Sequence, residues 1–192
     1  MTAPHVVAVC GSLRADSYTR IALERALTTV RSMDGSTEFI DLETMELPVF
    51  NADNSDAGDA VALRSSVRAA DAVILGSPMY HGSYSGALKN ALDYCGFDEF
   101  ENTTVGLLAV SGGSFPVPTL NHLRSVCRSL NAWVIPHQVA IPSVNSQIDD
   151  GAFVDPDIED RVVTLGQRAV EYATIEPEQH TVASTENVGA ED

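Results

Sequence analysis

Short apolar runs alternate along the chain with longer segments whose apolar residues recur at helical spacing. The apolar runs predict strands over residues 6–10, 37–42, 72–75, 104–110 and 133–141, with Pro136 interrupting the last one. The amphipathic segments predict helices over residues 17–31, 58–70, 85–95, 116–130 and 156–174. Alternation of this kind is typical of a parallel sheet with helices on both faces, so we expect a doubly wound α/β fold.

The expected sheet has five strands in the order 2-1-3-4-5, which places the first, third and fourth strands side by side. With 192 residues, the chain is long enough for one domain with a sizeable core, and we assign residues 1–175 to that domain. Residues 176–192 are polar and acidic, and we expect them to form a disordered tail.

Loops that contain glycine and serine follow these three neighbouring strands. They are Gly11–Arg14, Gly76–Gly82 and Ser111–Ser114, and each leads into a predicted helix. In a doubly wound sheet, loops at the carboxyl ends of neighbouring parallel strands meet over one crevice, where ligands bind. We therefore expect three separate pieces of sequence to build a single site.

The first loop has the features of a phosphate site. It leads into a helix N-terminus, which offers unpaired N–H groups and a partial positive charge. Ser12, Ser17 and Thr19 add hydroxyl groups, and Arg14 adds a fixed positive charge. The loop is neither a Walker A motif nor a dinucleotide-binding fingerprint. Taken alone, it is equally consistent with a capped strand-to-helix turn that carries an exposed arginine.

The chain is strongly acidic, with a formal net charge of −16 and a pI near 4.4. This charge argues against a nucleic-acid partner, because a polyphosphate would be repelled. Lys89 is the only lysine among the 11 cationic residues. Acid-rich, lysine-poor surfaces resemble those of proteins from salt-loving microbes, in which salt screens the self-repulsion. The alternative is an ordinary acidic bacterial protein with an arginine-rich composition.

Other sequence features indicate a protein of the cytoplasm. No apolar run approaches the roughly 18 residues that a membrane span needs, so we expect no membrane contact. The N-terminus enters the first apolar run without a basic leader, which predicts a cytoplasmic location. Cys10, Cys95 and Cys127 are odd in number and widely spaced, so we expect buried, reduced thiols and no metal site. If one thiol has a redox or metal role, Cys10 is the best candidate.

The loops carry a resemblance to a known family. The motif Gly-Ser-Leu-Arg-x-x-Ser-x-Thr at residues 11–19 resembles the phosphate loop of the NAD(P)H-dependent FMN reductases, a family that includes chromate, quinone and azo dye reductases. Residues 77–94 are similar to that family's second signature, and residues 111–113 fall where its third flavin loop is expected. The resemblance covers residues 5–175 and implies a flavodoxin-like fold with non-covalently bound FMN.

The resemblance also implies a set of cofactor-binding residues. Those of the phosphate end are Ser12, Arg14, Ser17, Tyr18 and Thr19. Those at the isoalloxazine ring are Pro78, Met79, Tyr80, His81 and Gly82 on one edge, and Ser111, Gly112 and Gly113 on the other. The family more often has Asn at the position of Thr19, and Glu or Val at that of Met79. No side chain is expected to be catalytic, because the flavin carries the chemistry.

Family members are usually dimers or tetramers, so the resemblance implies a homodimer or homotetramer. It places the helix after the second loop at the dimer interface, with Leu88, Ala91, Leu92 and Tyr94 packed against the partner. Lys89 and Asp93, four residues apart on the same helix, predict a surface ion pair.

The implied function is hydride transfer from a nicotinamide nucleotide through FMN to a small-molecule acceptor. Free flavin, a quinone, an azo or nitro compound and a metal oxyanion remain open as acceptors, and so do NADPH and NADH as donors. The alternatives are a flavodoxin-type electron carrier and a flavin-binding sensor. A hydrolase is disfavoured, because the chain has no Gly-x-Ser-x-Gly nucleophile elbow.

Overall fold

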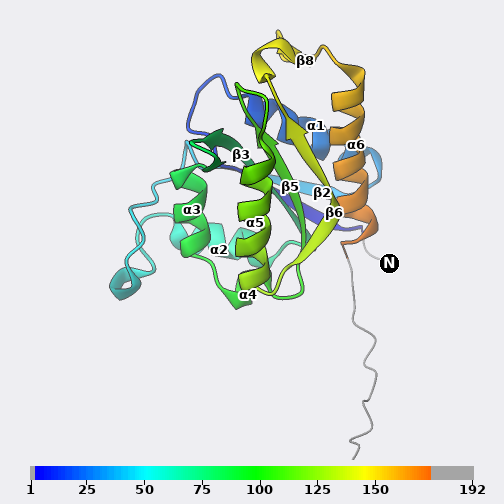
Figure 1. The fold of residues 1–192 in the computed structure, drawn as a ribbon. Helices are drawn as coiled ribbons and strands as arrows, with labels where there is room; N and C mark the ends of the chain where they lie inside the picture. The colour runs from blue at the N-terminus through cyan, green and yellow to red at the C-terminus, as the bar shows by residue number, and fades with distance from the viewer. Residues whose placement is uncertain (1–2, 174–192) are drawn as a thin grey trace, which may run out of the picture.

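A parallel β-sheet forms the middle layer of the molecule, and helices cover both of its faces (Figure 1). The computed structural model describes residues 3–173. The expectation of a disordered tail over residues 176–192 lies outside the described residues. The strands of the main sheet are β1 (His5–Cys10), β2 (Ser36–Asp41), β3 (Ala72–Tyr80), β4 (Ser83–Tyr84), β5 (Thr104–Val110) and β6 (Trp133–Ile141).

The sheet contains six strands, so the predicted count of five is wrong. Its parallel strands lie in the order β2-β1-β3-β5-β6, and the short β4 pairs antiparallel with the end of β3. Sequence alone predicts a loop from residue 76 to residue 82, but Ser77 and Pro78 continue the pairing with β5 as far as Val110. The chain then reverses at His81 and Gly82, whose φ angles are 51° and 83°.

Two long helices cover one face of the sheet, and three shorter helices cover the other. On the first face lie α1 (Tyr18–Ser32) and α6 (Pro156–Glu171), which pack against each other. On the second face lie α2 (Ala60–Arg68), α3 (Gly86–Asp93) and α5 (Val117–Ser129). Short elements that sequence alone does not predict are the helix α4 (Phe97–Phe100), the 3₁₀ turns η1 (Ala52–Asn54) and η2 (Val144–Ser146), and the hairpin β7 (Ile148–Asp149) with β8 (Ala152–Phe153).

Each face of the sheet has its own hydrophobic core. Side chains alternate along a strand, so Ala8 of β1 belongs to the core under α1 and α6, while Val7 belongs to the opposite core. Leu88, Ala91, Leu92 and Tyr94 are at most 5% exposed and pack inside this second core. The expectation that they contact a partner subunit is therefore wrong, because other residues of the same chain cover them. Lys89 and Asp93 form the predicted surface ion pair.

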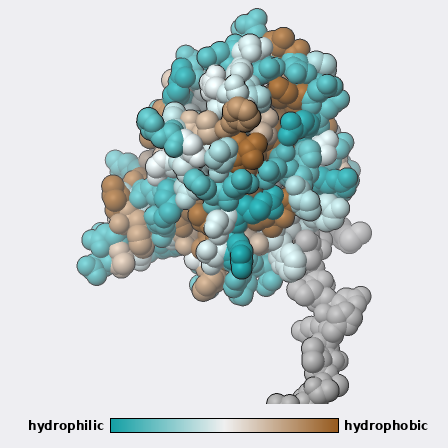
Figure 2. Space-filling view, in the orientation of Figure 1, coloured by the Kyte–Doolittle hydropathy of each residue, from teal (hydrophilic) through white to brown (hydrophobic). Residues whose placement is uncertain are grey.

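The surface is polar over most of the face seen in Figure 2, and hydrophobic residues form scattered patches there. Among residues 3–173, no helix has the length and apolar character that a membrane crossing requires.

One of the two edges of the parallel sheet is the strand β6. Its register with β5 shifts between Val105 and Leu107, opposite the segment that contains Pro136. Arg124 of α5 donates to the main-chain carbonyl of Ile135 at 3.2 Å. Arg161 of α6 donates to the carbonyl of Gln138 at 3.3 Å. A helix from each face thus places a guanidinium on the backbone of this edge strand.

Candidate functional site

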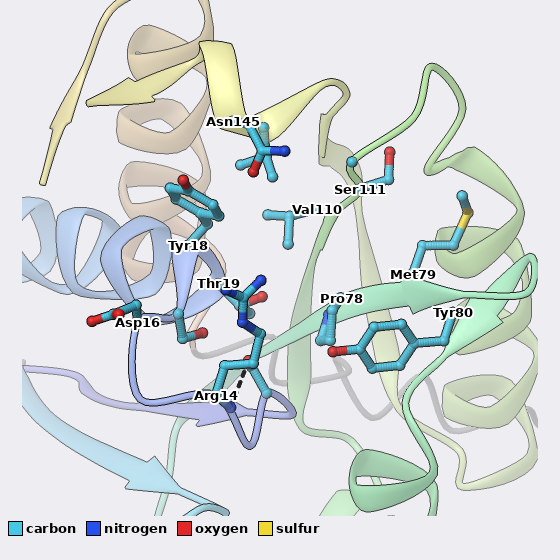
Figure 3. A pocket seen from close by; sticks show the side chains of 14 residues that line it. Arg14, Asp16, Tyr18, Thr19, Pro78, Met79, Tyr80, Val110, Ser111 and Asn145 are labelled. Atoms are coloured by element: carbon cyan, nitrogen blue, oxygen red, sulfur yellow. Dashed lines mark hydrogen bonds between the residues drawn. The ribbon is translucent and has the colours of Figure 1, made fainter. Parts of the chain in front are cut away.

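A pocket opens at the carboxyl ends of β1, β3 and β5 (Figure 3). Ten of its lining residues belong to the predicted cofactor-binding set: Ser12, Arg14, Ser17, Tyr18, Thr19, Pro78, Met79, Tyr80, Ser111 and Gly112. Four further residues complete the lining: Asp16, Val110, Val144 and Asn145. The structure therefore brings the three loops together over one crevice, as a doubly wound sheet requires.

The start of α1 provides donors that have no protein partner. Ser17 caps the helix, and its hydroxyl accepts from the Arg20 N–H at 3.2 Å. Among residues 3–173, no protein group accepts from the N–H groups of Tyr18 and Thr19. The Thr19 hydroxyl is also without a partner, although this residue is only 1% exposed. A buried polar atom without a hydrogen bond is costly, so this end of the pocket is arranged for a ligand that accepts hydrogen bonds.

Charged side chains flank these donors. Arg14 lines the pocket and makes no ion pair within the described residues. Figure 3 shows its side chain rising from the loop beside Thr19. An unpaired guanidinium next to a helix N-terminus favours an anion such as a phosphate. Asp16 lines the same pocket and contributes a negative charge that opposes this attraction.

The first two loops are fastened together by buried serines. Ser77 Oγ accepts from the Ser85 N–H at 2.9 Å, and Ser85 Oγ donates to the Gly11 carbonyl at 2.6 Å. A Cβ atom on Gly11 would lie 2.8 Å from Leu88 Cβ and 3.0 Å from the Gly76 carbonyl oxygen. Glycine at position 11 thus permits the close approach of β1, β3 and α3 that shapes the floor of the site.

The third loop is connected to the segment after β6. Ser111 Oγ donates to the Gly113 carbonyl at 2.6 Å, which fixes the turn. The Val144 N–H donates to the Ser111 carbonyl, and the Ser143 N–H to the Gly113 carbonyl, both at 2.9 Å. These bonds hold η2 at the pocket, where Asn145 joins the lining. A Cβ atom built on Gly112 would meet nothing within 4 Å, so a flat ligand has room to approach the backbone there.

Three predicted site residues lie outside the pocket lining. His81 and Gly82 form the turn between β3 and β4. Gly113 points its carbonyl to Ser111 and Ser143, so it supports the loop from behind. Contact between these three residues and a cofactor stays a prediction.

Four residues that line the pocket were not predicted from the sequence. Asp16 and Val110 lie within or beside the recognised loops, so their positions could have been added from adjacency alone. Val144 and Asn145 carry no such signal, because η2 reaches the pocket only through its bonds to the third loop. Figure 3 places Asn145 and Tyr18 on one side of the pocket, across from Met79 and Tyr80.

The pocket therefore has two chemically different ends. The anion-binding end consists of the unpaired N–H groups, the Thr19 hydroxyl and Arg14. The other end is a wall of apolar side chains and main chain that includes Pro78, Met79 and Gly112. The sequence profile of the NADPH-dependent FMN reductases matches residues 4–146. The chain belongs to this family. The two ends of the pocket fit the phosphate and the flat ring of FMN.

Known proteins of similar sequence and structure support this family assignment. An FMN-dependent NADPH-azoreductase of Staphylococcus saprophyticus is 36% identical over 154 residues, which cover 76% of this chain and 81% of that protein. A Staphylococcus aureus protein of the same description is 34% identical over 184 residues, covering 90% of this chain and 96% of that one. The solved structure of FerB, a flavoenzyme NAD(P)H:(acceptor) oxidoreductase from Paracoccus denitrificans, has a TM-score of 0.73 at 21% identity, covering 88% and 97% of the two chains.

These findings confirm the expected family and class of enzyme. The chain is an FMN-dependent NAD(P)H oxidoreductase with a flavodoxin-like α/β fold, and NADPH is the donor that the family description names. The alternative of a flavodoxin-type carrier or a sensor without turnover is not favoured.

Proposed function

We propose that this chain uses NADPH to reduce a small aromatic acceptor at bound FMN, and that azo compounds are among its acceptors. The observation that carries the proposal is the Thr19 hydroxyl, which is buried, without a partner and adjacent to Arg14 in the pocket. Two azoreductases among the relatives of this chain support the choice of acceptor.

The anion-binding end would hold the FMN phosphate. The Thr19 hydroxyl and the N–H groups of Tyr18 and Thr19 donate, and Arg14 adds charge-assisted bonds. Ser12 is 3% exposed, and its hydroxyl accepts from the Arg14 N–H at 3.4 Å, which steadies the loop. In a chain of net charge −16, these local donors are what make the pocket attractive to a phosphate dianion.

The opposite end would orient the ring. Pro78 and Met79 at the end of β3 form one wall, and the backbone at Ser111 and Gly112 forms another. No protein group accepts from the Gly112 N–H within the described residues, so this N–H is free to donate to the ring edge. FMN, when bound, supplies the two-electron chemistry between NADPH and the acceptor. The protein binds and orients FMN and leaves its ring accessible to NADPH and to the acceptor.

Access to the ring end is open. Tyr80 is 50% exposed at the pocket and Asn145 is exposed on the facing side. An aromatic face at the rim favours flat partners such as a nicotinamide or an aryl azo compound, because aromatic rings stack on one another.

We also propose a cytoplasmic homodimer. Leu13 of the phosphate loop and Val49 are 57% and 87% exposed, and both line a groove between residues 42–49 and α3. Exposed apolar residues in such a groove are typical of a protein contact. Sedimentation analysis tests the assembly, and a monomer at all concentrations would contradict it.

The first experiment records the visible spectrum of the purified protein with added FMN, then adds NADPH or NADH without oxygen. We expect a flavin spectrum that bleaches faster with NADPH, followed by reoxidation when an azo dye is added. Free FMN with NADPH is the control for uncatalysed reduction. A protein that takes up no FMN would contradict the cofactor assignment, and bound FMN that neither nucleotide bleaches would contradict the reductase function.

A further inference from the structure

Arg20 lies on the reverse side of the loop that forms the anion-binding end. Its Nη1 donates to the carbonyl of Arg14 at 3.1 Å and to the carbonyl of Ala15 at 2.7 Å. Its Nε donates to Asp41 Oδ2 at 2.7 Å, at the end of β2. Arg20 lines a separate cleft with α1 and the β7–β8 hairpin and is absent from the lining of the cofactor pocket. It therefore touches the loop without facing the ligand.

These hydrogen bonds determine the orientation of the peptide groups that follow Arg14 and Ala15. A trans peptide unit is planar, and its C=O and N–H groups point in opposite directions. When Arg20 holds the carbonyls of Arg14 and Ala15, the N–H groups of Ala15 and Asp16 are turned away from Arg20. Within residues 3–173, neither N–H has a protein acceptor, and no peptide bond is cis.

We propose that Arg20 is a positioning residue for phosphate recognition, which turns the N–H groups of the 14–16 loop toward the ligand's phosphate. The proposal rests on the proposed function. The Arg20 N–H also binds Ser17 Oγ, so one residue fastens the loop at both ends. Asp41 keeps the guanidinium in place, and their hydrogen bond raises the pKa of Arg20 above its ordinary value.

The role predicts a selective defect. Loss of the Arg20 side chain frees the two carbonyls to rotate, and the N–H groups lose their common direction. A ligand with a phosphate depends on that direction, whereas a ligand without one does not. Riboflavin is FMN without its phosphate, so the ratio of the two dissociation constants isolates the contribution of the loop.

The experiment measures the dissociation constants of FMN and riboflavin for the wild type, Arg20→Met, Arg20→Lys and Arg25→Met. Arg25 is the matched control, because it also lies on α1, pairs with Glu159 at 2.6 Å and makes no bond to the loop. We expect Arg20→Met to weaken FMN about tenfold and riboflavin less than twofold. Arg20→Lys should recover part of the loss, since an ammonium can reach one carbonyl but lacks the fork.

The outcomes separate the two hypotheses. A wild type that binds neither flavin contradicts the proposed function. The wild type should bind FMN more tightly than riboflavin. If Arg20→Met then loses affinity for both flavins by the same factor, the positioning role is wrong and Arg20 has a general structural role. An unchanged FMN affinity in Arg20→Met also overturns it. Urea unfolding of each variant verifies that binding is compared between folded proteins.

Discussion

Ser85 Oγ donates a 2.6 Å hydrogen bond to the main-chain carbonyl of Gly11 and also caps α3 by accepting from the Leu88 N–H at 3.1 Å. One buried hydroxyl thus joins the end of β1 to the start of α3 beneath the cofactor pocket. The second loop of the site therefore depends on the first for its position.

Replacing Ser85 by alanine should lower the stability of the fold. The Ser85→Ala variant loses a helix cap and leaves a buried carbonyl without its donor, which costs about 2 kcal/mol. Urea unfolding monitored by circular dichroism measures the change. Ser129→Ala is the control, because within the described residues its exposed hydroxyl bonds only to the Ser125 carbonyl of the same helix. Equal stability of Ser85→Ala and Ser129→Ala would contradict the coupling.

Thr19→Val should separate stability from cofactor affinity. Valine has nearly the same shape and removes a buried hydroxyl that has no partner, so the ligand-free protein should be equally stable or more stable. FMN should bind roughly fivefold more weakly, since the hydroxyl is a phosphate donor. Fluorescence titration and urea unfolding give the two quantities.

Thr119→Val provides the matched control for this variant. Thr119 Oγ1 is also buried and unpaired, but it lies in α5 and outside the pocket lining. This variant should keep the affinity of the wild type for FMN. If both variants lost FMN affinity alike, the assignment of Thr19 to the phosphate would fail.

The two charged residues of the phosphate loop should act in opposite directions. Arg14→Ala should weaken FMN binding by about 2 kcal/mol, because a charge-assisted bond is lost. Asp16→Asn should tighten it by roughly threefold, since a negative charge at the pocket is removed. Titrations at low and high salt should show both effects shrinking as salt screens the charges. Unchanged affinity in Arg14→Ala would contradict the phosphate site.

Two cysteines should make the fold less stable at alkaline pH. Burial raises the pKa of Cys95 and of Cys127 from 9.0 to about 12. Below pH 9 both the folded and unfolded states hold these protons, so the thiols contribute no slope. Between pH 9 and about pH 12 the unfolded state loses them first, so the free energy of unfolding falls as pH rises.

The measurement compares urea unfolding of the wild type and Cys127→Ala between pH 8 and pH 10.5. The variant should show a shallower decline, because one of the buried thiols that drive it is gone. Other alkaline groups titrate in both proteins and cancel in the comparison. Parallel curves would show that Cys127 has no such linkage.

The acidic composition predicts a protein stabilised by salt. A net charge of −16 produces self-repulsion in the folded state, and molar KCl screens it. The melting temperature should therefore rise between dilute buffer and 2 M KCl by several degrees. Sucrose at equal osmolality is the control for solute exclusion without screening. Equal melting temperatures in dilute buffer and in KCl would remove the salt-adapted interpretation.

Sequence patterns predicted those parts of the fold that local chemistry determines. The bounds of β5 and β6 follow the sequence prediction, because both segments are rich in apolar residues and lie between polar turns, although Pro136 interrupts the second one. The end of β3 could not be predicted in this way. Pro78 normally signals a loop, yet it sits opposite Val110, and that pairing depends on a strand about 30 residues away.

The same distinction between local patterns and contacts of distant segments explains which site residues could be predicted. The first loop could be identified because a helix N-terminus with Ser17 and Thr19 has a local signature. Asn145 could not, because only the bonds between η2 and the third loop bring it to the pocket. Helical spacing showed that Leu88 and Leu92 lie on an apolar face, but it does not say whether the sheet or a second subunit covers that face.

The guanidinium groups on β6 have a further consequence for how the protein behaves at high concentration. An open edge strand is a template on which another chain can add its own strand and begin an aggregate. Here Pro136 removes a donor from that edge, and Arg124 and Arg161 occupy two of its acceptors. These groups therefore hinder the addition of a further strand at this edge, and this lowers the tendency of the protein to polymerise through it.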